Sequence, residues 1–159
     1  MKERRTNSGP KSAPAQARKM LYQHAIPRVK DAIENRYPLE AIALLESMIA
    51  DRLEARVAAL PAKNGVRAAR TFSMLAKLAT TLRSENSGES GDAKGIYQEV
   101  AEWARHRNKA LHEMVKLAEG NTEEWGARMN EAQSAATKGL VLFRKVDALV
   151  KKLNKPAKK

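Results

Sequence analysis

Apolar residues recur at spacings of three and four along most of the chain, which is the period of amphipathic helices. One clear pattern covers residues 39–60, and its members are Ile42, Leu45, Ile49, Leu53, Val57 and Leu60. Leu44 and Met48 widen this apolar face beyond one stripe. A helix with so wide an apolar face is predicted to be central in the fold, or to be shared between the core and a dimer interface.

The same period predicts three more principal helices, over residues 68–84, 92–119 and 122–153. A preliminary helical stretch is predicted over residues 17–35. No segment reads as a strand. Pro27 lies in the preliminary stretch and is expected to bend it, because proline has no backbone N–H. Gly139, in the last helix, marks either close packing or a bend. We predict an all-α fold, an antiparallel four-helix bundle with an extra N-terminal helical segment.

Helix ends are marked by residues that favour caps and turns. Pro61 ends the first long helix and Gly120 ends the third, while Asn121 and Glu124 form a capping-box pattern before the fourth. Residues 84–95 are a loop by composition. Their glycines are followed by no Gly-Lys-Ser/Thr string and preceded by no strand, so they predict a mobile connection rather than a nucleotide-binding loop.

Composition narrows the function classes. A chain of 159 residues suits one domain, and the absence of cysteine excludes disulfides and thiolate metal sites. The three histidines form no metal-binding string, so we expect neither a metal site nor a cofactor. The sequence has no run of about 18 apolar residues, so we expect no membrane span. The basic N-terminus lacks the apolar segment of a signal peptide, so we expect a cytoplasmic protein.

The net charge of +12 is concentrated at the two ends of the chain. Residues 1–20 carry +5 and residues 151–159 another +5, which leaves +2 on the residues between them. We therefore predict disordered basic tails over residues 1–16 and 155–159, around a helical domain over residues 17–154. Such tails either keep the protein soluble or attract phosphate backbones in a salt-sensitive way.

A string of six residues breaks the pattern of the third principal helix: Arg107-Asn108-Lys109-Ala110-Leu111-His112. On a helical wheel Arg107 lies in the centre of the apolar stripe formed by Ile96, Val100, Trp103, Leu111, Met114 and Ala118. An unpaired cation in such a stripe is costly. We therefore expect Arg107 to meet a buried carboxylate, to open into a cleft or to bind an anion.

Arginine, asparagine and histidine together are suited to phosphate chemistry. Histidine exchanges protons near neutral pH, and arginine stabilises charge that builds up on phosphate oxygens. RNA supplies its own nucleophile, the 2′-hydroxyl, so this chemistry needs no metal. However, Arg107 and His112 are about 140° apart on an ideal helix, whereas Asn108 and His112 share a face. A kink, or a second copy of the helix in a twofold dimer, would bring all three to one phosphate.

The string fits the Arg-polar-x-x-x-His motif of the HEPN superfamily, and residues 37–56 and 97–108 resemble the opening helix and the approach to the motif in these domains. The resemblance covers residues 37–150. It implies a homodimer whose motif helices line one cleft, with His112 as base or acid, Arg107 as phosphate clamp and Asn108 as positioning residue. It also implies an RNA substrate and a toxin, phage-defence or RNA-processing role, often beside an antitoxin protein.

A hypothesis of another class stays open. Many HEPN members keep the fold and bind RNA or a partner protein without cutting it. In that case Arg107 is expected to pair with a carboxylate such as Glu46 or Glu54. The two hypotheses differ in one geometric requirement, because a ribonuclease needs Arg107 and His112 exposed to a common cleft. His106 is expected to face solvent without a role in either case.

Overall fold

A computed structural model of the chain describes residues 12–61, 74–116 and 124–156. Within these segments the chain forms helices and no strand, which confirms the predicted all-α fold. The elements are α1 (Ser12–Glu34), α2 (Pro38–Ala59), α3 (Leu75–Arg83), the single 3₁₀ turn η1 (Glu85–Ser87), α4 (Gly91–His112) and α5 (Trp125–Leu153). No helix in the described part of the chain is long and apolar enough to cross a membrane.

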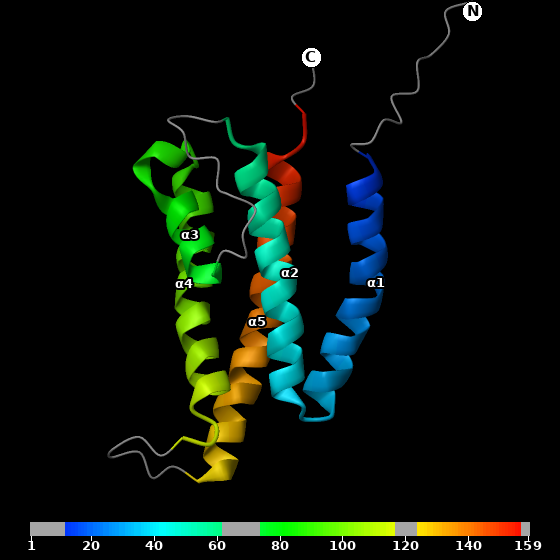
Figure 1. The fold of residues 1–159 in the computed structure, drawn as a ribbon, viewed down its shortest axis with the longest axis vertical. Helices are drawn as coiled ribbons and strands as arrows, with labels where there is room; N and C mark the ends of the chain where they lie inside the picture. The colour runs from blue at the N-terminus through cyan, green and yellow to red at the C-terminus, as the bar shows by residue number, and fades with distance from the viewer. Residues whose placement is uncertain (1–11, 62–73, 117–123, 157–159) are drawn as a thin grey trace, which may run out of the picture.

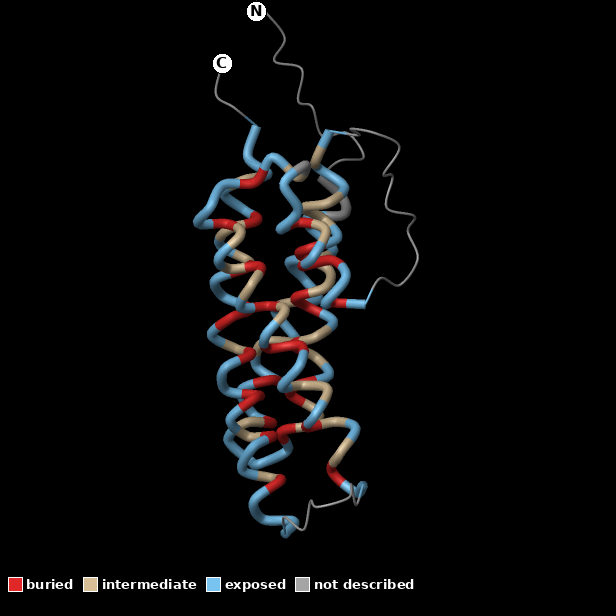
Figure 2. The backbone as a smooth tube through the Cα atoms, turned by 90° about the vertical axis from the view of Figure 1, so that its left-hand side faces the viewer, coloured by how far each residue is buried: buried red, intermediate tan, exposed pale blue. Residues whose placement is uncertain are grey.

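Consecutive long helices run antiparallel, so the bundle has two distinct ends (Figure 1). One end holds the start of α1 and the end of α5. The other end holds the turn between α1 and α2, the last turn of α4 and the first turn of α5 (Figure 1). In Figure 2, the buried positions recur along the inward faces of the helices. The fold is a bundle of α2, α3, α4 and α5, with α1 packed against α2.

The central position predicted for α2 is confirmed. One face of α2 packs on α5 and another on α1, and Ile42, Leu45, Ile49 and Leu53 are fully buried between them. Tyr22 of α1 also reaches past α2 to meet Phe143 of α5 edge to face, with ring centroids 5.4 Å apart. The wide apolar face of α2 is therefore covered within one chain. The width of this apolar face is therefore explained without a dimer interface.

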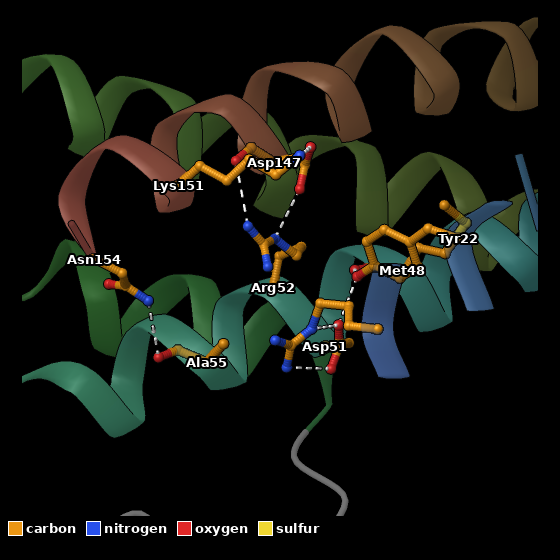
Figure 3. A network of polar contacts seen from close by, with 9 residues as sticks. Tyr22, Met48, Asp51, Arg52, Ala55, Asp147, Lys151 and Asn154 are labelled. Atoms are coloured by element: carbon orange, nitrogen blue, oxygen red, sulfur yellow. Dashed lines mark hydrogen bonds and ion pairs between the residues drawn. The ribbon is translucent and has the colours of Figure 1, made fainter. Parts of the chain in front are cut away.

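Polar contacts join α2 to both of its neighbours (Figure 3). Asp51 Oδ2 accepts hydrogen bonds from Arg18 Nε and from the Tyr22 hydroxyl, each at 2.5 Å. On the other side of α2, Arg52 Nε lies 2.9 Å from Asp147 Oδ1. Burial opposes the ionisation of Asp51, but the hydrogen bonds from Arg18 and Tyr22 outweigh it and hold the pKa of Asp51 below its ordinary value.

Helix boundaries differ from the predicted ones at several points. α1 begins at Ser12, so residues 12–16, predicted as tail, are helical, and the helix continues through Pro27. The predicted helix over residues 68–84 is described only from Leu75 to Arg83. Residues 1–11, 62–73, 117–123 and 157–159, which include most of the predicted tails and the predicted caps at Gly120 and Asn121, lie outside the described residues. Glu124 occupies the N-cap of α5 without a side-chain hydrogen bond.

α4 ends at His112 and not at residue 119, the predicted end. The Glu113 amide still donates to the Lys109 carbonyl, but the chain then turns and Lys116 N donates to Glu113 O. The α4 start also differs, because Ser90 caps it by accepting a hydrogen bond from the Ala93 amide. Only residues 84–90 therefore connect α3 to α4.

This connection, predicted to be mobile, carries one buried carboxylate with partners on two helices. The side chain of Glu89 is 1% exposed, and its Oε1 accepts from Arg56 Nη2 at 2.5 Å. Its Oε2 accepts from the Tyr97 hydroxyl at 2.9 Å. Burial and the bond to Glu89 raise the pKa of Tyr97. Glu89 thus ties the connection to the end of α2 and to α4.

Gly139 marks close packing, which was one of the two predicted alternatives. A Cβ atom at Gly139 would lie 2.7 Å from Cζ2 of Trp103. The indole is held there because Trp103 Nε1 donates a hydrogen bond of 2.8 Å to the carbonyl of Ala135. The indole of α4 therefore lies directly against the backbone of α5.

Candidate functional site

α4 carries all three predicted site residues in its last two turns. Arg107 faces α2, where its Nη2 forms an ion pair with Oε1 of Glu46. The side chain of Arg107 is 12% exposed and that of Glu46 is 32% exposed. The guanidinium therefore lies at the edge of the seam between α2 and α4, with its charge matched by one carboxylate. Glu54, the other carboxylate considered from the sequence, is exposed.

Asn108 is the second partner of the Arg107 guanidinium. Arg107 Nη1 donates a hydrogen bond of 2.6 Å to Asn108 Oδ1. Asn108 is four residues before His112 and shares its face of the helix. The Asn108 amide oxygen therefore joins Arg107, which is paired with Glu46, to a residue one helical turn before His112.

His112 is the last residue of α4 and is exposed. The structure therefore brings together Arg107, Asn108 and Glu46, and leaves His112 one helical turn beyond Asn108 on the solvent side. Arg107 Nε is buried and has no hydrogen-bond partner among the described residues. Within one chain the cluster holds one arginine and one carboxylate, so a phosphate would bind to a guanidinium that Glu46 already orients.

Arg128 of α5 fixes the helix end that carries His112. Its Nη1 donates to the carbonyls of Glu113, Met114 and Lys116 at 2.5, 3.3 and 2.7 Å. The residue is only 8% exposed. A cation at this position satisfies carbonyls that a helix end leaves unpaired and is favoured by the helix dipole. The first turn of α5 and the residues that follow His112 are therefore held against each other.

Arg128 was not among the site residues predicted from the sequence, although the sequence carries the same signal for it as for Arg107. Arg128 lies three residues after Trp125 and four before Ala132, in the row of residues that faces the core farther along α5. A cation in such a row requires a buried acceptor. The partners are backbone carbonyls of another element, which no side-chain pattern reveals.

An open groove of about 730 Å³ lies between α4 and α5, on a different side of α4 from Glu46. Its lining includes Trp103, His106, Lys109, Glu131, Lys138 and Leu142, but neither Arg107 nor His112. His106, predicted to face solvent, is exposed at this groove. In the described part of the chain, no three His, Asp or Glu side chains gather as a metal site. Arg107 and His112 do not share this groove.

The chain was compared with known proteins at three levels. No protein-family model matches it, no curated protein is significantly similar to it, and no solved structure matches it. The functional interpretation therefore depends on the residues of the chain and on their geometry.

Proposed function

We propose that the chain is a metal-independent endoribonuclease of the HEPN type. In this proposal His112 transfers protons, Arg107 stabilises charge on the phosphate and Asn108 positions the reacting groups. The substrate is RNA, because only RNA carries the 2′-hydroxyl that acts as the nucleophile.

One observation carries the proposal: the contact of 2.6 Å between Arg107 Nη1 and Asn108 Oδ1, one helical turn before the exposed His112. It supports a site in which a cation, an amide and an imidazole lie along one side of a rigid helix. Glu46 supports the same interpretation, since a carboxylate on Nη2 fixes the plane of the guanidinium. A fixed guanidinium needs little reorganisation when charge develops on a phosphate.

The proposed reaction is a transesterification. A base removes the proton of the 2′-hydroxyl, the 2′-oxygen forms a bond to phosphorus, and the bond from phosphorus to the 5′-oxygen breaks. The leaving 5′-oxygen takes a proton from an acid, so the products are a 2′,3′-cyclic phosphate and a 5′-hydroxyl. His112 is suited to either proton transfer, because the unperturbed pKa of histidine lies near neutrality. Arg107 would stabilise the additional charge on the two non-bridging oxygens.

Cleavage of purified cellular RNA by the full chain and by three variants tests this function. Replacement of His112 by alanine should lower the rate about 10²- to 10⁴-fold, which is the usual contribution of general acid–base catalysis. Arg107→Ala should cause at least a comparable loss. His106→Ala is the matched control and should have a small effect, since His106 lies on the same helix but lines the groove between α4 and α5. EDTA should leave the rate unchanged. Cleavage undiminished in His112→Ala would disprove the mechanism.

A second candidate function is a helical module that binds RNA or a partner protein without catalysis. The ion pair between Arg107 and Glu46 favours it, because a guanidinium matched by a carboxylate needs no phosphate. The same assay separates the two functions. A non-catalytic module would release no cyclic phosphate, and Arg107→Ala would lower its melting temperature rather than any rate.

A further inference from the structure

A basic row follows one face of α4 to the end of the bundle that carries His112. It consists of Arg105, Lys109 and His112, followed by Lys116 in the turn after the helix, and all four side chains are exposed. Spacings of four and three place Arg105, Lys109 and His112 on one face of α4, and Lys116 lies in the turn just beyond it. Within the described residues, only Lys109 of the four forms an ion pair, with Glu131. The row contains no acidic residue, so it is complementary to a chain of phosphates.

An exposed indole lies at the end of this row. Trp125 is the first residue of α5 and is 60% exposed. It occupies the same row of α5 as Arg128 and Ala132, which are both buried. The indole is therefore on the inner face of α5, but at a level where α4 has already ended. An exposed indole offers a flat apolar face, with one N–H donor, on which a planar group can stack.

Arg128 sets the position of the indole relative to the basic row. Its three hydrogen bonds to the carbonyls of Glu113, Met114 and Lys116 join the first turn of α5 to the last residues of the row. Trp125 lies less than one helical turn from Arg128 along α5. The end of α4, at His112, and the start of α5, at Trp125, therefore lie at the same end of the bundle (Figure 1), and Arg128 joins Lys116 to α5 there.

We propose that Trp125 is a base-stacking residue of this protein, on which an unpaired base of single-stranded RNA lies while its phosphates follow the basic row. The inference rests on the proposed function and adds the part of the substrate that the site recognises. Aromatic faces bind unpaired bases of any sequence, whereas bases in a duplex are already stacked on one another. A cationic row that ends at an aromatic side chain is the arrangement by which single strands are bound.

Direct binding of an uncleavable strand tests the proposal. The probe is a labelled 2′-O-methyl RNA of about twelve nucleotides, which cannot undergo attack by a 2′-hydroxyl, and it is used as a single strand and as a duplex. Trp125→Ala in the full chain should raise the Kd for the single strand about tenfold, since stacking of one base contributes about 1–3 kcal/mol. Trp125→Phe should keep most of the affinity. The Kd for the duplex should change less than about twofold.

A matched control and a spectroscopic readout separate stacking from loss of structure. Leu21 of α1 is 68% exposed, and α1 does not contact α4, so Leu21→Ala should leave both Kd values unchanged. The single strand should also quench tryptophan emission, because Trp125 is exposed whereas Trp103 is buried. That quenching should disappear in Trp125→Phe. Replacement of Lys116 by alanine should weaken binding and lower its salt dependence by about one counterion.

Each remaining outcome decides the question. The proposal is wrong if Trp125→Ala binds the single strand like the unsubstituted chain, if the duplex loses as much affinity, or if the chain binds no RNA. It is also wrong if Trp125→Ala changes only the oligomeric state, which would make this end a contact between copies. Trp125-dependent binding without cleavage of unmodified RNA would leave the inference standing and disprove the ribonuclease. Cleavage that depends on His112 but not on Trp125 would support the ribonuclease and disprove the stacking inference.

Discussion

Two arginine side chains with little exposure show how single residues shape the candidate site. Arg107 meets the carboxylate of Glu46 and the amide of Asn108, whereas Arg128 meets three backbone carbonyls beyond the end of α4. In each case the charge is removed from water and must be compensated by fixed acceptors. Both guanidinium groups are therefore held in place, one beside the Asn108 face and one behind His112.

Gly139 is a residue at which packing and helix propensity act in opposite directions. Alanine would gain about 1 kcal/mol of helix propensity, but its Cβ would lie 2.7 Å from the indole of Trp103. Overpacking of this kind costs about 1–3 kcal/mol, and the bond from Trp103 to Ala135 prevents an easy shift. We expect Gly139→Ala to lower the melting temperature by a few degrees. Gly95 of α4 has open space around it, so Gly95→Ala should raise the melting temperature or leave it unchanged. A more stable Gly139→Ala would refute the close packing.

Asp51 makes stability dependent on pH. Its pKa in the folded protein is below the unfolded value of about 4, because the bonds from Arg18 and Tyr22 outweigh the effect of burial. Its stabilisation is therefore present above pH 4 or so and is lost as the pH falls further. Asp51→Asn should melt below the unsubstituted chain near pH 7, and the gap should shrink near pH 3. Asp31, which is more exposed, provides the control Asp31→Asn, with little gap at either pH. A gap that persists in acid would contradict this linkage.

At the scale of elements, the end of α4 depends on α5. The chain leaves the helix after His112, and Arg128 accounts for three of the carbonyls at this end. α4 alone carries the residues of the proposed site, but the orientation of its last turn is set by a side chain from the next helix. The two helices therefore form one functional unit.

Replacement of Arg128 by methionine tests this dependence. Methionine keeps the apolar stem of the side chain but removes the donors, so the Lys116 carbonyl loses its bond from Arg128 and the Glu113 carbonyl keeps only the bond from the Lys116 amide. Hydrogen bonds from charged donors contribute about 1.5–3 kcal/mol each, so the end of α4 should open more often. Hydrogen exchange at the amides of Glu113 and Lys116 should become faster. Arg144→Met, at an exposed position of the same helix, should leave these rates unchanged. Equal protection in both variants would show that Arg128 does not hold this helix end.

At the scale of the whole molecule, the described helices separate the candidate site from the chain ends. α1 starts and α5 ends at one end of the bundle, whereas His112 and Trp125 lie at the other (Figure 1). Much of the charge of +12 belongs to the terminal segments. The proposed recognition by the basic row and Trp125 uses described residues alone, and the dimer predicted from the sequence depends on the divergence of Arg107 and His112.

Mixing of two inactive variants tests whether a dimer assembles the site. If Arg107 of one copy acts with His112 of the other, a dimer of Arg107→Ala with His112→Ala contains one intact site. Random exchange in an equal mixture should then restore about a quarter of the activity of the unsubstituted chain. Light scattering at micromolar concentration gives the mass of the species. A monomer, or a mixture as inactive as its components, would disprove the shared site.

The sequence by itself determined the helical class and most of the core. Spacings of three and four predicted α2, most of α4 and α5, and the central place of α2, because burial of one apolar face largely defines an amphipathic helix. The same periodicity singled out Arg107 as a cation in an apolar stripe, which required only the geometry of one helix and the cost of an unpaired charge. The sequence left Glu46 and Glu54 open as partners, and the structure decided for Glu46.

Only the tertiary structure decided which surfaces meet. It covered the second face of α2 with α1, ended α4 at His112, fixed the connection before α4 through Glu89, and placed Arg128 behind the end of α4. It also turned the guanidinium of Arg107 toward Asn108 and left Trp125 exposed. Periodicity along one helix cannot determine these features, because each depends on groups from another element, and several of those groups are backbone carbonyls that every residue carries.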